Sequence, residues 1–190
     1  IAELRLYYYP PGQNSVTVYP IGIGQLGGDT LTPTMVTTVS DKRANPTWTP
    51  TANIRARYKA MGIDLPAVVP AGPNNPMGHH AIRLAAYGGV YLLHGTNADF
   101  GIGMRVSSGC IRLRDADIKS LYNKITPGTR VNIINEPIKV SVEPNGTRLV
   151  EVHQPLSEHI NDDPQTLPIV LNAGMKNFKQ APQTNQQVME

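Results

Sequence analysis

Apolar residues along the chain gather in short alternating runs, and turn-forming residues separate these runs. Leu4–Tyr9 and Val16–Tyr19 flank the turn segment Pro10–Asn14, which predicts a β-hairpin. Similar runs predict strands at residues 35–39, 80–86, 90–94, 110–113, 130–134, 138–142 and 148–152. Asn145-Gly146 separates the last two runs and predicts a second hairpin. The body of the chain is therefore expected to be mainly β.

Three segments have helical character instead. Thr51–Met61 is the first of them. Asp115 has the position of an N-cap for a short helix that ends near Ile125, because Ile118 and Leu121 fall on one helical face. Asp163-Pro164 can open a third helix that continues to about Phe178.

The composition changes after His153, where residues 155–190 become polar and rich in amides. A chain of 190 residues fits one ordinary domain with room for an appendage. We therefore expect one domain over residues 1–153 and a partly helical C-terminal extension over residues 154–190. The 17 glycines and 17 prolines suit a fold with short strands and long loops, where function usually lies.

The distribution of charged and apolar residues argues against nucleic-acid binding and against a transmembrane helix. Seventeen basic and 14 acidic residues give a net charge of +3, but the basic residues form no run or stripe, so nucleic-acid binding is not expected. No apolar run approaches the roughly 18 residues of a transmembrane helix. The chain also opens without a signal peptide, and because Ile1–Tyr9 already has a strand pattern, we expect it to start inside a larger precursor.

Gly22–Gly27 matches the G-x-G-x-x-G pattern of dinucleotide-binding folds. That function needs a helix directly after the glycines, so that its N-terminus can hold a pyrophosphate. The segment around Thr32-Pro33-Thr34 cannot start a long helix. The glycines therefore indicate a loop, not a cofactor site.

The single cysteine, Cys110, opens an apolar run, and His94 ends another. A glycine-rich loop joins the two runs and can bring the thiol and the imidazole together. A thiol with a pKa of about 8.5 is mostly protonated at neutral pH, and a nearby histidine can make it nucleophilic. The backbone N–H groups of Ser108, Gly109 and Cys110 can form an oxyanion hole. Arg112, two residues beyond the cysteine, shares its face of a strand and can favour the thiolate and dock a carboxylate.

Each of these residues also has an ordinary structural interpretation when taken alone. Cys110 can be a buried packing residue, His94 a structural histidine, Arg112 a solvated strand residue and Ser107 a turn residue. The combination with the glycine loop favours a nucleophilic site. His79 and His80 either form a polar loop pair or line a substrate groove. A zinc site formed by these two histidines with His94 and Cys110 is a further hypothesis, although a metal-bound thiolate would be a poor nucleophile.

The motif around the cysteine resembles that of the L,D-transpeptidase catalytic domain, the YkuD family. The resemblance rests on His94-Gly95-Thr96, on the fifteen residues between His94 and Cys110, and on Ser107–Arg112. It extends to Thr32-Pro33-Thr34, to Asn75-Pro76-Met77-Gly78 before Ala81-Ile82-Arg83-Leu84, and to Asp115-Ala116-Asp117-Ile118. Many members have histidine and asparagine where this chain has Ser108 and Arg112. The similarity is greatest to periplasmic enzymes of enteric bacteria that attach Braun lipoprotein to peptidoglycan.

The resemblance implies a mainly antiparallel β-sandwich and an acyl-transfer mechanism without metal or organic cofactor. Cys110 would attack a tetrapeptide stem at diaminopimelate, expel D-alanine and form a thioacyl-enzyme, with His94 as acid and base. The Gly95 carbonyl would orient the imidazole, and Ser107 would support the loop. Ser107, Arg112, His79 and His80 are the predicted substrate-binding residues. Carbapenems are the β-lactams expected to acylate such a thiol.

The acceptor of the acyl group remains open at this point. The C-terminal lysine of Braun lipoprotein, a diaminopimelate amine or water would give lipoprotein anchoring, a 3→3 cross-link or L,D-carboxypeptidase activity, and the enteric likeness favours the first. The implied partners are peptidoglycan stem peptides and Braun lipoprotein, and the implied location is the periplasm. A module that binds the wall without catalysis is the alternative of a different class.

Overall fold

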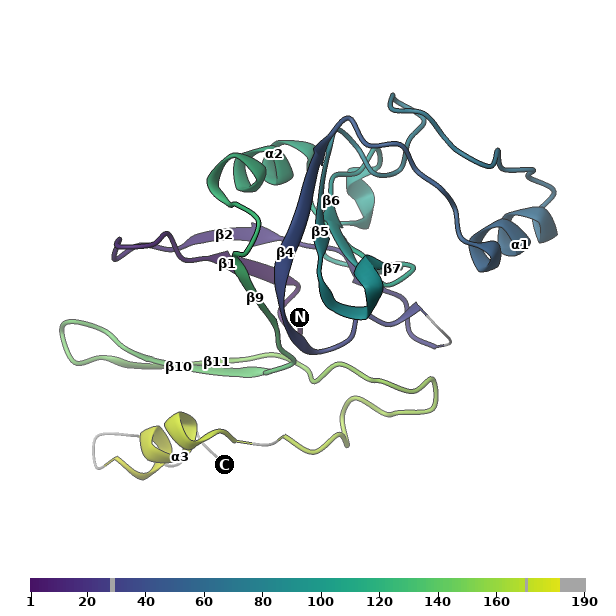
Figure 1. Ribbon diagram of the computed structural model, residues 1–190. Coiled ribbons are helices and arrows are strands. Elements are labelled where there is room, and N and C mark those ends of the chain that lie inside the picture. The colour runs from purple at the N-terminus through teal and green to yellow at the C-terminus, as the bar shows by residue number, and fades with distance from the viewer. Residues whose placement is uncertain (28–29, 170, 182–190) are drawn as a thin grey trace. The chain divides into compact units, whose positions relative to one another are not determined.

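The computed structural model describes residues 1–27, 30–169 and 171–181 (Figure 1). The strands within these residues are β1 Arg5–Tyr8, β2 Thr17–Pro20, β3 Ile23–Gly24, β4 Met35–Ala44, β5 His80–Leu84, β6 Leu92–His94, β7 Arg105–Ser107, β8 Ile111–Arg112, β9 Arg130–Ile133, β10 Ile138–Val142 and β11 Arg148–Val152. The α-helices are α1 Ala52–Ala60, α2 Asp115–Lys124 and α3 Ala173–Gln180. The mainly β fold class is confirmed.

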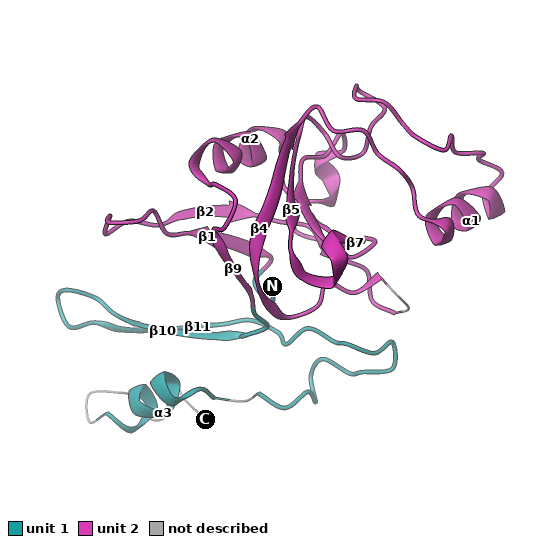
Figure 2. Ribbon diagram, in the orientation of Figure 1, with its two compact units in different colours: residues 1–3, 134–190 teal, residues 4–133 magenta. Residues whose placement is uncertain are grey.

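The chain forms two compact units, which are coloured separately in Figure 2. One unit comprises residues 4–133, and the other comprises residues 1–3 with residues 134–190. The predicted domain boundary after residue 153 falls inside the second unit and stays a prediction. Each unit is described by itself below.

A five-stranded sheet in the order β8-β6-β5-β4-β9 forms the centre of the unit 4–133. Adjacent strands of this sheet are antiparallel, except for β6 and β8, which are parallel. The strands are short because glycines, prolines and polar turns follow each apolar run. The side chains of Ile82, Leu84 and Leu93 are buried in this unit and belong to its core.

Helix α2 packs on β5 and β6 through Ile118 and Leu121, which are both buried. On β5, the ring of His80 lies 4.8 Å from the ring of Tyr122 on α2. Successive residues of a strand point to opposite faces of the sheet. Because His80 faces α2, Ala81 and Arg83 face away from α2. One face of the sheet is thereby covered by α2, and the other face is left for a groove.

The unit that contains residues 134–190 is built on the antiparallel hairpin β10–β11 and helix α3. Met175 and Phe178 are the buried residues of α3. The guanidinium of Arg148 on β11 lies 3.9 Å from the centre of the Phe178 ring and donates a hydrogen bond of 3.0 Å to the Phe178 carbonyl. This stacking connects the helix to the hairpin.

The structure confirms most predicted elements and corrects several boundaries. The two hairpins, α1 and α2 lie where the patterns predicted them, although Asp115 is the first residue of α2 and not its N-cap. The third helix begins at Ala173, because Asn172 accepts the N-capping hydrogen bond from Met175, and not at Pro164. Strand β4 continues to Ala44, beyond the strand predicted at residues 35–39.

The Gly22–Gly27 segment contains a strand that the sequence did not predict. Strand β3 pairs parallel with β7, which lies in the glycine-rich loop before Cys110. A side chain at Gly22 would collide with the Gly101 carbonyl, and one at Gly24 with the backbone of Thr30. These glycines are therefore required for close backbone packing, in agreement with their interpretation as something other than a cofactor site.

Candidate active site

The parallel pairing of β6 with β8 brings the cysteine and the histidine to one end of the sheet. Leu93 is opposite Ile111, and His94 is opposite Arg112. Leu93 and Ile111 are buried. Since side chains alternate along a strand, His94, Arg112 and Cys110 point to the other face. The sequence predicted this shared face for Cys110 and Arg112, and the strand register adds His94 to it.

A groove of about 500 Å³ lies on this face. Its lining comes from six stretches of the unit 4–133: Asp41 and Arg43 on β4, segment 46–58 with one face of α1, Pro76-Met77, Ala81 and Arg83 on β5, segment 88–94, and segment 107–112. Cys110, His94, Arg112, Ser107 and Ser108 are all among its lining residues. The groove is large enough to hold a short peptide segment.

His94 is buried, with 6% of its surface exposed. Its Nδ1 lies 2.6 Å from the Gly95 carbonyl oxygen. A carbonyl can only accept, so Nδ1 carries the proton and donates it, which leaves Nε2 as the basic nitrogen. Burial lowers the pKa of His94 from 6.5 to about 4; the Gly95 bond raises that pKa and the Arg112 charge lowers it. The imidazole is therefore neutral at pH 7.

We expect the stability of the protein to fall on acidification because of His94. The unfolded chain binds a proton at this histidine near pH 6.5, whereas the folded chain resists it down to about pH 4. The contribution of neutral His94 to the free energy of unfolding is therefore complete above pH 6.5. It decreases by about 3 kcal/mol as the pH falls to 4. Urea titrations of the wild type and His94→Gln at pH 7, 5.5 and 4 measure this contribution. Equal pH dependence in both proteins would contradict it.

Cys110 is a free cysteine of intermediate exposure. Its Sγ lies 3.7 Å from the Val90 carbonyl oxygen, which accepts the thiol proton. Burial raises the pKa of the thiol, while a hydrogen bond from the backbone of Leu92 and the charges of Arg112 and Arg83 lower it. The resting side chain is consequently a protonated thiol that faces groups able to stabilise its thiolate.

The loop before Cys110 is held by two hydroxyl groups. Ser107 is 2% exposed, and its Oγ donates to the Cys110 carbonyl at 2.5 Å and accepts from the Gly109 N–H at 3.2 Å. Thr32 Oγ1 donates to the Gly109 carbonyl at 2.8 Å and accepts from the Gly24 N–H at 2.8 Å. Ser107 and Thr32 thus fix the peptide units on both sides of Gly109.

We expect Gly109→Ala to distort this loop. Gly109 has a φ of +104°, and a Cβ there would lie 3.0 Å from Cε1 of Tyr91 and 3.2 Å from the Leu31 carbonyl oxygen. The conformation alone costs about 1–3 kcal/mol for a residue with a side chain, so modification of Cys110 should slow about tenfold or more. Gly103→Ala is the matched control, because Gly103 has a φ of +81° but open space around its Cβ position. Equal carbapenem acylation rates in both variants would contradict the steric argument.

Arg112 lies on β8, opposite His94 on β6, and lines the groove. Its side chain is half-buried, and its Nε atom is buried without a hydrogen-bond partner among the described residues. Burial lowers the pKa of its guanidinium. An arginine side chain nevertheless remains protonated in proteins. The groove therefore contains a fixed positive charge beside the thiol.

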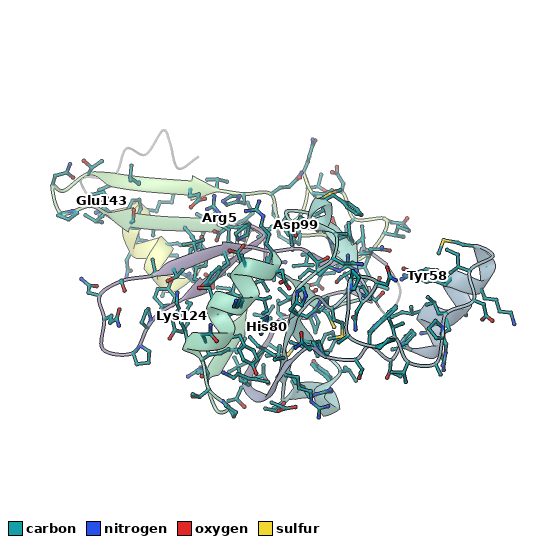
Figure 3. All side chains as sticks on the ribbon, turned by 90° about the horizontal axis from the view of Figure 1, so that it is seen from above. Arg5, Tyr58, His80, Asp99, Lys124 and Glu143 are labelled. Atoms are coloured by element: carbon teal, nitrogen blue, oxygen red, sulfur yellow. The ribbon has the colours of Figure 1, made fainter. Side chains whose placement is uncertain are left out.

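The structure does not bring His79 and His80 to the groove. Nδ1 of His79 lies 2.7 Å from Oδ2 of Asp115, at the start of α2. His80 is labelled in Figure 3. Its ring packs on the ring of Tyr122, and burial lowers its pKa. Neither residue is among the groove-lining residues. We therefore propose neither a substrate-binding role for these two histidines nor a zinc site formed by them with His94 and Cys110.

A profile of the L,D-transpeptidase catalytic domain, YkuD, matches residues 1–133, and one of the L,D-transpeptidase C-terminal domain matches residues 137–190. The chain belongs to the L,D-transpeptidase family. The two matches meet close to the division between the two compact units at residues 133 and 134.

Two similar relatives come from Escherichia coli K12. The chain is 85% identical to probable L,D-transpeptidase YcfS over its full length, which covers 59% of that relative, and 52% identical to probable L,D-transpeptidase YbiS, of which it covers 61%. The chain thus spans about three fifths of these curated relatives. A crystal structure of L,D-transpeptidase 3 from Mycobacterium tuberculosis matches 66% of this chain and 48% of its own with 20% identity and a TM-score of 0.43.

The sequence alone did not identify the residues of the L,D-transpeptidase groove that come from α1. Ile54, Arg57 and Tyr58 line it from one helical face, and Nη2 of Arg57 donates to Ser108 Oγ at 3.2 Å. In Figure 1, α1 stands at the end of long connections, so spacing alone cannot position it. Asn75, fully buried, anchors these connections: its Nδ2 donates to the Pro46 carbonyl at 2.9 Å.

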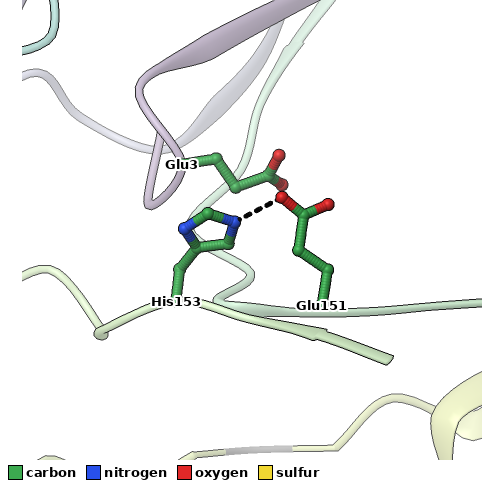
Figure 4. A group of neighbouring side chains, drawn as sticks. All are labelled: Glu3, Glu151 and His153. Carbon is green, nitrogen blue, oxygen red and sulfur yellow. Dashed lines mark hydrogen bonds and ion pairs between the residues drawn. The ribbon is translucent and has the colours of Figure 1, made fainter. Parts of the chain in front are cut away.

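Metal-ligand atoms converge elsewhere in this L,D-transpeptidase chain. Among the described residues, Glu3, Glu151 and His153 offer ligand atoms within 4.8 Å of one another (Figure 4). His153 Nε2 is already 2.7 Å from Glu151, and Lys139 Nζ lies 2.6 Å from a Glu3 oxygen. Because the Lys139 ammonium opposes a cation, we assign no metal to this group. Within the same residues, every helix is too short or too polar for a membrane span.

Proposed function

We propose that this chain carries out L,D-transpeptidation of peptidoglycan through a Cys110 thioacyl-enzyme. The observation that carries the proposal is the placement of Cys110 and a buried His94 on one face of β6–β8, in one groove. Family membership supports the same reaction. The donor is the tetrapeptide stem, cleaved at the L-centre of diaminopimelate.

In the first step, Cys110 Sγ attacks the carbonyl carbon that joins diaminopimelate to D-alanine. Nε2 of His94 takes the thiol proton and then gives it to the leaving amine, so the C–N bond breaks as a thioester forms. In the second step, an acceptor amine attacks the thioester and loses its proton to His94, and Cys110 leaves as the thiol. The Gly95 carbonyl supports this role because it fixes the His94 tautomer.

The oxyanion of each tetrahedral intermediate needs hydrogen-bond donors near Cys110. The Gly109 N–H already donates to Ser107 Oγ, so the N–H groups of Ser108 and Cys110 are the better candidates in this loop. Ser107 then acts on the loop and not on substrate, because both contacts of its hydroxyl are with the backbone of residues 109 and 110. Arg112 is the substrate-binding residue of the predicted set, with a charge suited to a carboxylate.

The acceptor and the location complete the proposal. We take the C-terminal lysine of Braun lipoprotein as the principal acceptor and the periplasm as the compartment. The relatives that support this choice are enteric L,D-transpeptidases, including probable L,D-transpeptidase ErfK/SrfK of Escherichia coli K12, 54% identical over 89% of this chain. A diaminopimelate amine or water as acceptor gives the alternative activities.

The test offers one donor and three acceptors to the wild-type chain. A disaccharide tetrapeptide is incubated alone, with a peptide that ends in lysine, with a second stem peptide, and with both acceptors in competition. The products are separated by mass. We expect D-alanine release in every arm and an amide to the lysine ε-amine as the most abundant product in competition. A cross-linked or hydrolysed main product would replace the proposed acceptor. No D-alanine release in any arm would favour a binding module over an enzyme.

A further inference from the structure

The turn that joins β5 to β6, residues 85–91, has an unusual backbone. Three successive residues within it, Tyr87, Gly88 and Gly89, have left-handed conformations with φ values of 52°, 68° and 78°. This region is unfavourable for a tyrosine and persists only where the surrounding structure imposes it. The β5–β6 turn therefore depends on contacts that hold it in place.

The end of the β5–β6 turn lies against Cys110 and the residue before it. The Val90 carbonyl oxygen is 3.7 Å from Cys110 Sγ and accepts the thiol proton. The ring of Tyr91 lies beside Gly109, because a Cβ added at Gly109 would be 3.0 Å from Tyr91 Cε1. The position of this turn therefore restrains both the sulfur and the peptide that precedes it.

Arg83 on β5 binds the same turn. Its Nη1 donates a hydrogen bond of 2.6 Å to the Gly89 carbonyl. Gly89 is buried, and a Cβ added there would be 3.0 Å from Arg83 Cδ and 3.4 Å from Arg83 Nη1. The Arg83 side chain thus packs directly on the backbone of Gly89. The bonded carbonyl belongs to the peptide unit between Gly89 and Val90, so Arg83 restrains the residue that accepts the thiol proton.

The charge of Arg83 acts on the thiol as well. Burial raises the pKa of Cys110, and the Arg83 guanidinium is one of the groups that lower it. An arginine stays protonated in proteins, so this charge is present at every pH of interest. A thiol is only a weak donor, so its bond to Val90 orients the sulfur more than it stabilises the protonated form. Loss of Arg83 should consequently raise the thiol pKa.

We propose that Arg83 is a positioning residue for Cys110: it fixes the β5–β6 turn, and through the Val90 carbonyl of that turn it directs the sulfur, while its charge favours the thiolate. The proposal rests on the proposed role of Cys110 as nucleophile. It assigns to β5 and its turn a part in preparing the sulfur before any peptide is bound.

The test compares two reactions at the same sulfur. Iodoacetamide alkylates an accessible thiolate without a demand for one approach, and the pH dependence of its rate gives the thiol pKa. A carbapenem acylates the sulfur only when the sulfur is directed at the lactam carbonyl. The ratio of the carbapenem rate to the iodoacetamide rate at pH 7 therefore measures how well the sulfur is positioned.

Arg83→Met keeps an apolar stem and removes the charge and the hydrogen-bond donors. We expect the thiol pKa to rise by about one unit and the ratio of the two rates to fall about tenfold. Arg83→Lys keeps the charge and one compact donor, so the thiol pKa should stay close to that of the wild type and the ratio should recover in part. A purely structural role would lower the melting temperature of Arg83→Met but would move neither readout.

Gly89→Ala tests the contact with the turn while the arginine is retained. A Cβ at Gly89 would displace the Arg83 side chain, whereas a Cβ at Gly88 would meet nothing within 4 Å. Both variants place a side chain at a left-handed φ, so the backbone effect is matched. The ratio should fall further in Gly89→Ala than in Gly88→Ala. Arg130→Met removes an exposed arginine of β9, in the same sheet, and should leave both readouts at their wild-type values.

Two outcomes would overturn the inference while the proposed function stands. One is an Arg83→Met variant that keeps the wild-type ratio, even if its thiol pKa is shifted. The other is an equal loss of the ratio in Gly88→Ala and Gly89→Ala. A wild type that iodoacetamide alkylates, but that neither a tetrapeptide nor a carbapenem acylates, would instead remove the proposed function, and Arg83 would then have no acyl transfer to serve.

Discussion

Cys110→Ala is expected to abolish thioacyl-enzyme formation and to lower D-alanine release by more than about 10⁴-fold. In the proposed mechanism Cys110 itself forms the covalent intermediate, so no neighbouring group can replace it. Cys110 is the one cysteine of the chain, and therefore every thiol adduct reports on this position. The measurement is intact-protein mass after mixing with a carbapenem. The wild type should gain the mass of one drug molecule, and the variant should gain none.

The same experiment needs a control for the fold. Cys110 is of intermediate exposure, so alanine leaves a small void and should cost little stability. A thermal melt of the variant close to that of the wild type would establish this point. Cys110→Ser keeps a hydroxyl but not a thiol and should also form no adduct at the wild-type rate. A full drug adduct on Cys110→Ala would contradict the assigned nucleophile.

Sequence patterns could locate the proposed catalytic pair because both residues lie at the ends of apolar runs. His94 is the last residue of β6, and Cys110 directly precedes β8. The thiol, the imidazole and Arg112 were predicted together from spacing alone. The register of the parallel strands β6 and β8 explains why these side chains lie together, since His94 is opposite Arg112.

The sequence patterns did not predict features that depend on contacts between residues far apart in the chain. Adjacent strand residues point to opposite faces, so His80 faces Tyr122 while Ala81 faces the groove, and sequence does not show which face is which. Strand β3 pairs with the distant β7, and its Gly24 lies against the backbone of Thr30, and a glycine-rich pattern reveals neither contact. Arg57 reaches Ser108 across 51 positions, a separation that no local pattern bridges.

Burial creates an activation problem for the catalytic pair. The pKa of His94 lies at about 4, and burial raises the pKa of the Cys110 thiol. Proton transfer from Cys110 to His94 is therefore uphill in the free protein, and the resting pair is neutral. The charge of Arg112 lowers both pKa values, so it favours the thiolate but opposes the imidazolium. A carboxylate bound at Arg112 would reduce that opposition and favour protonated His94 when the donor is present.

His94→Gln is expected to slow acylation of Cys110 by about 10²- to 10⁴-fold, the usual contribution of a positioned general base. Glutamine keeps a polar side chain near the Gly95 carbonyl but has no basic nitrogen. The assay is the rate of acylation by a carbapenem at pH 7, with the melting temperature as the control for folding. A variant that keeps more than about half of the wild-type rate would contradict a role for His94 in proton transfer.

The pH profile gives this prediction a second readout. Because the imidazole stays neutral down to about pH 4, the wild-type rate should be nearly flat from pH 8 to pH 5.5 and should fall near pH 4. A histidine with an ordinary pKa near 6.5 would instead lower the rate roughly tenfold between pH 7.5 and pH 5.5. The acid limb should also disappear in His94→Gln, whose residual rate comes from the rare thiolate and rises steadily with pH. A limb near pH 6.5 in the wild type would mean that His94 is hydrated in solution, and the buried neutral base would have to be abandoned.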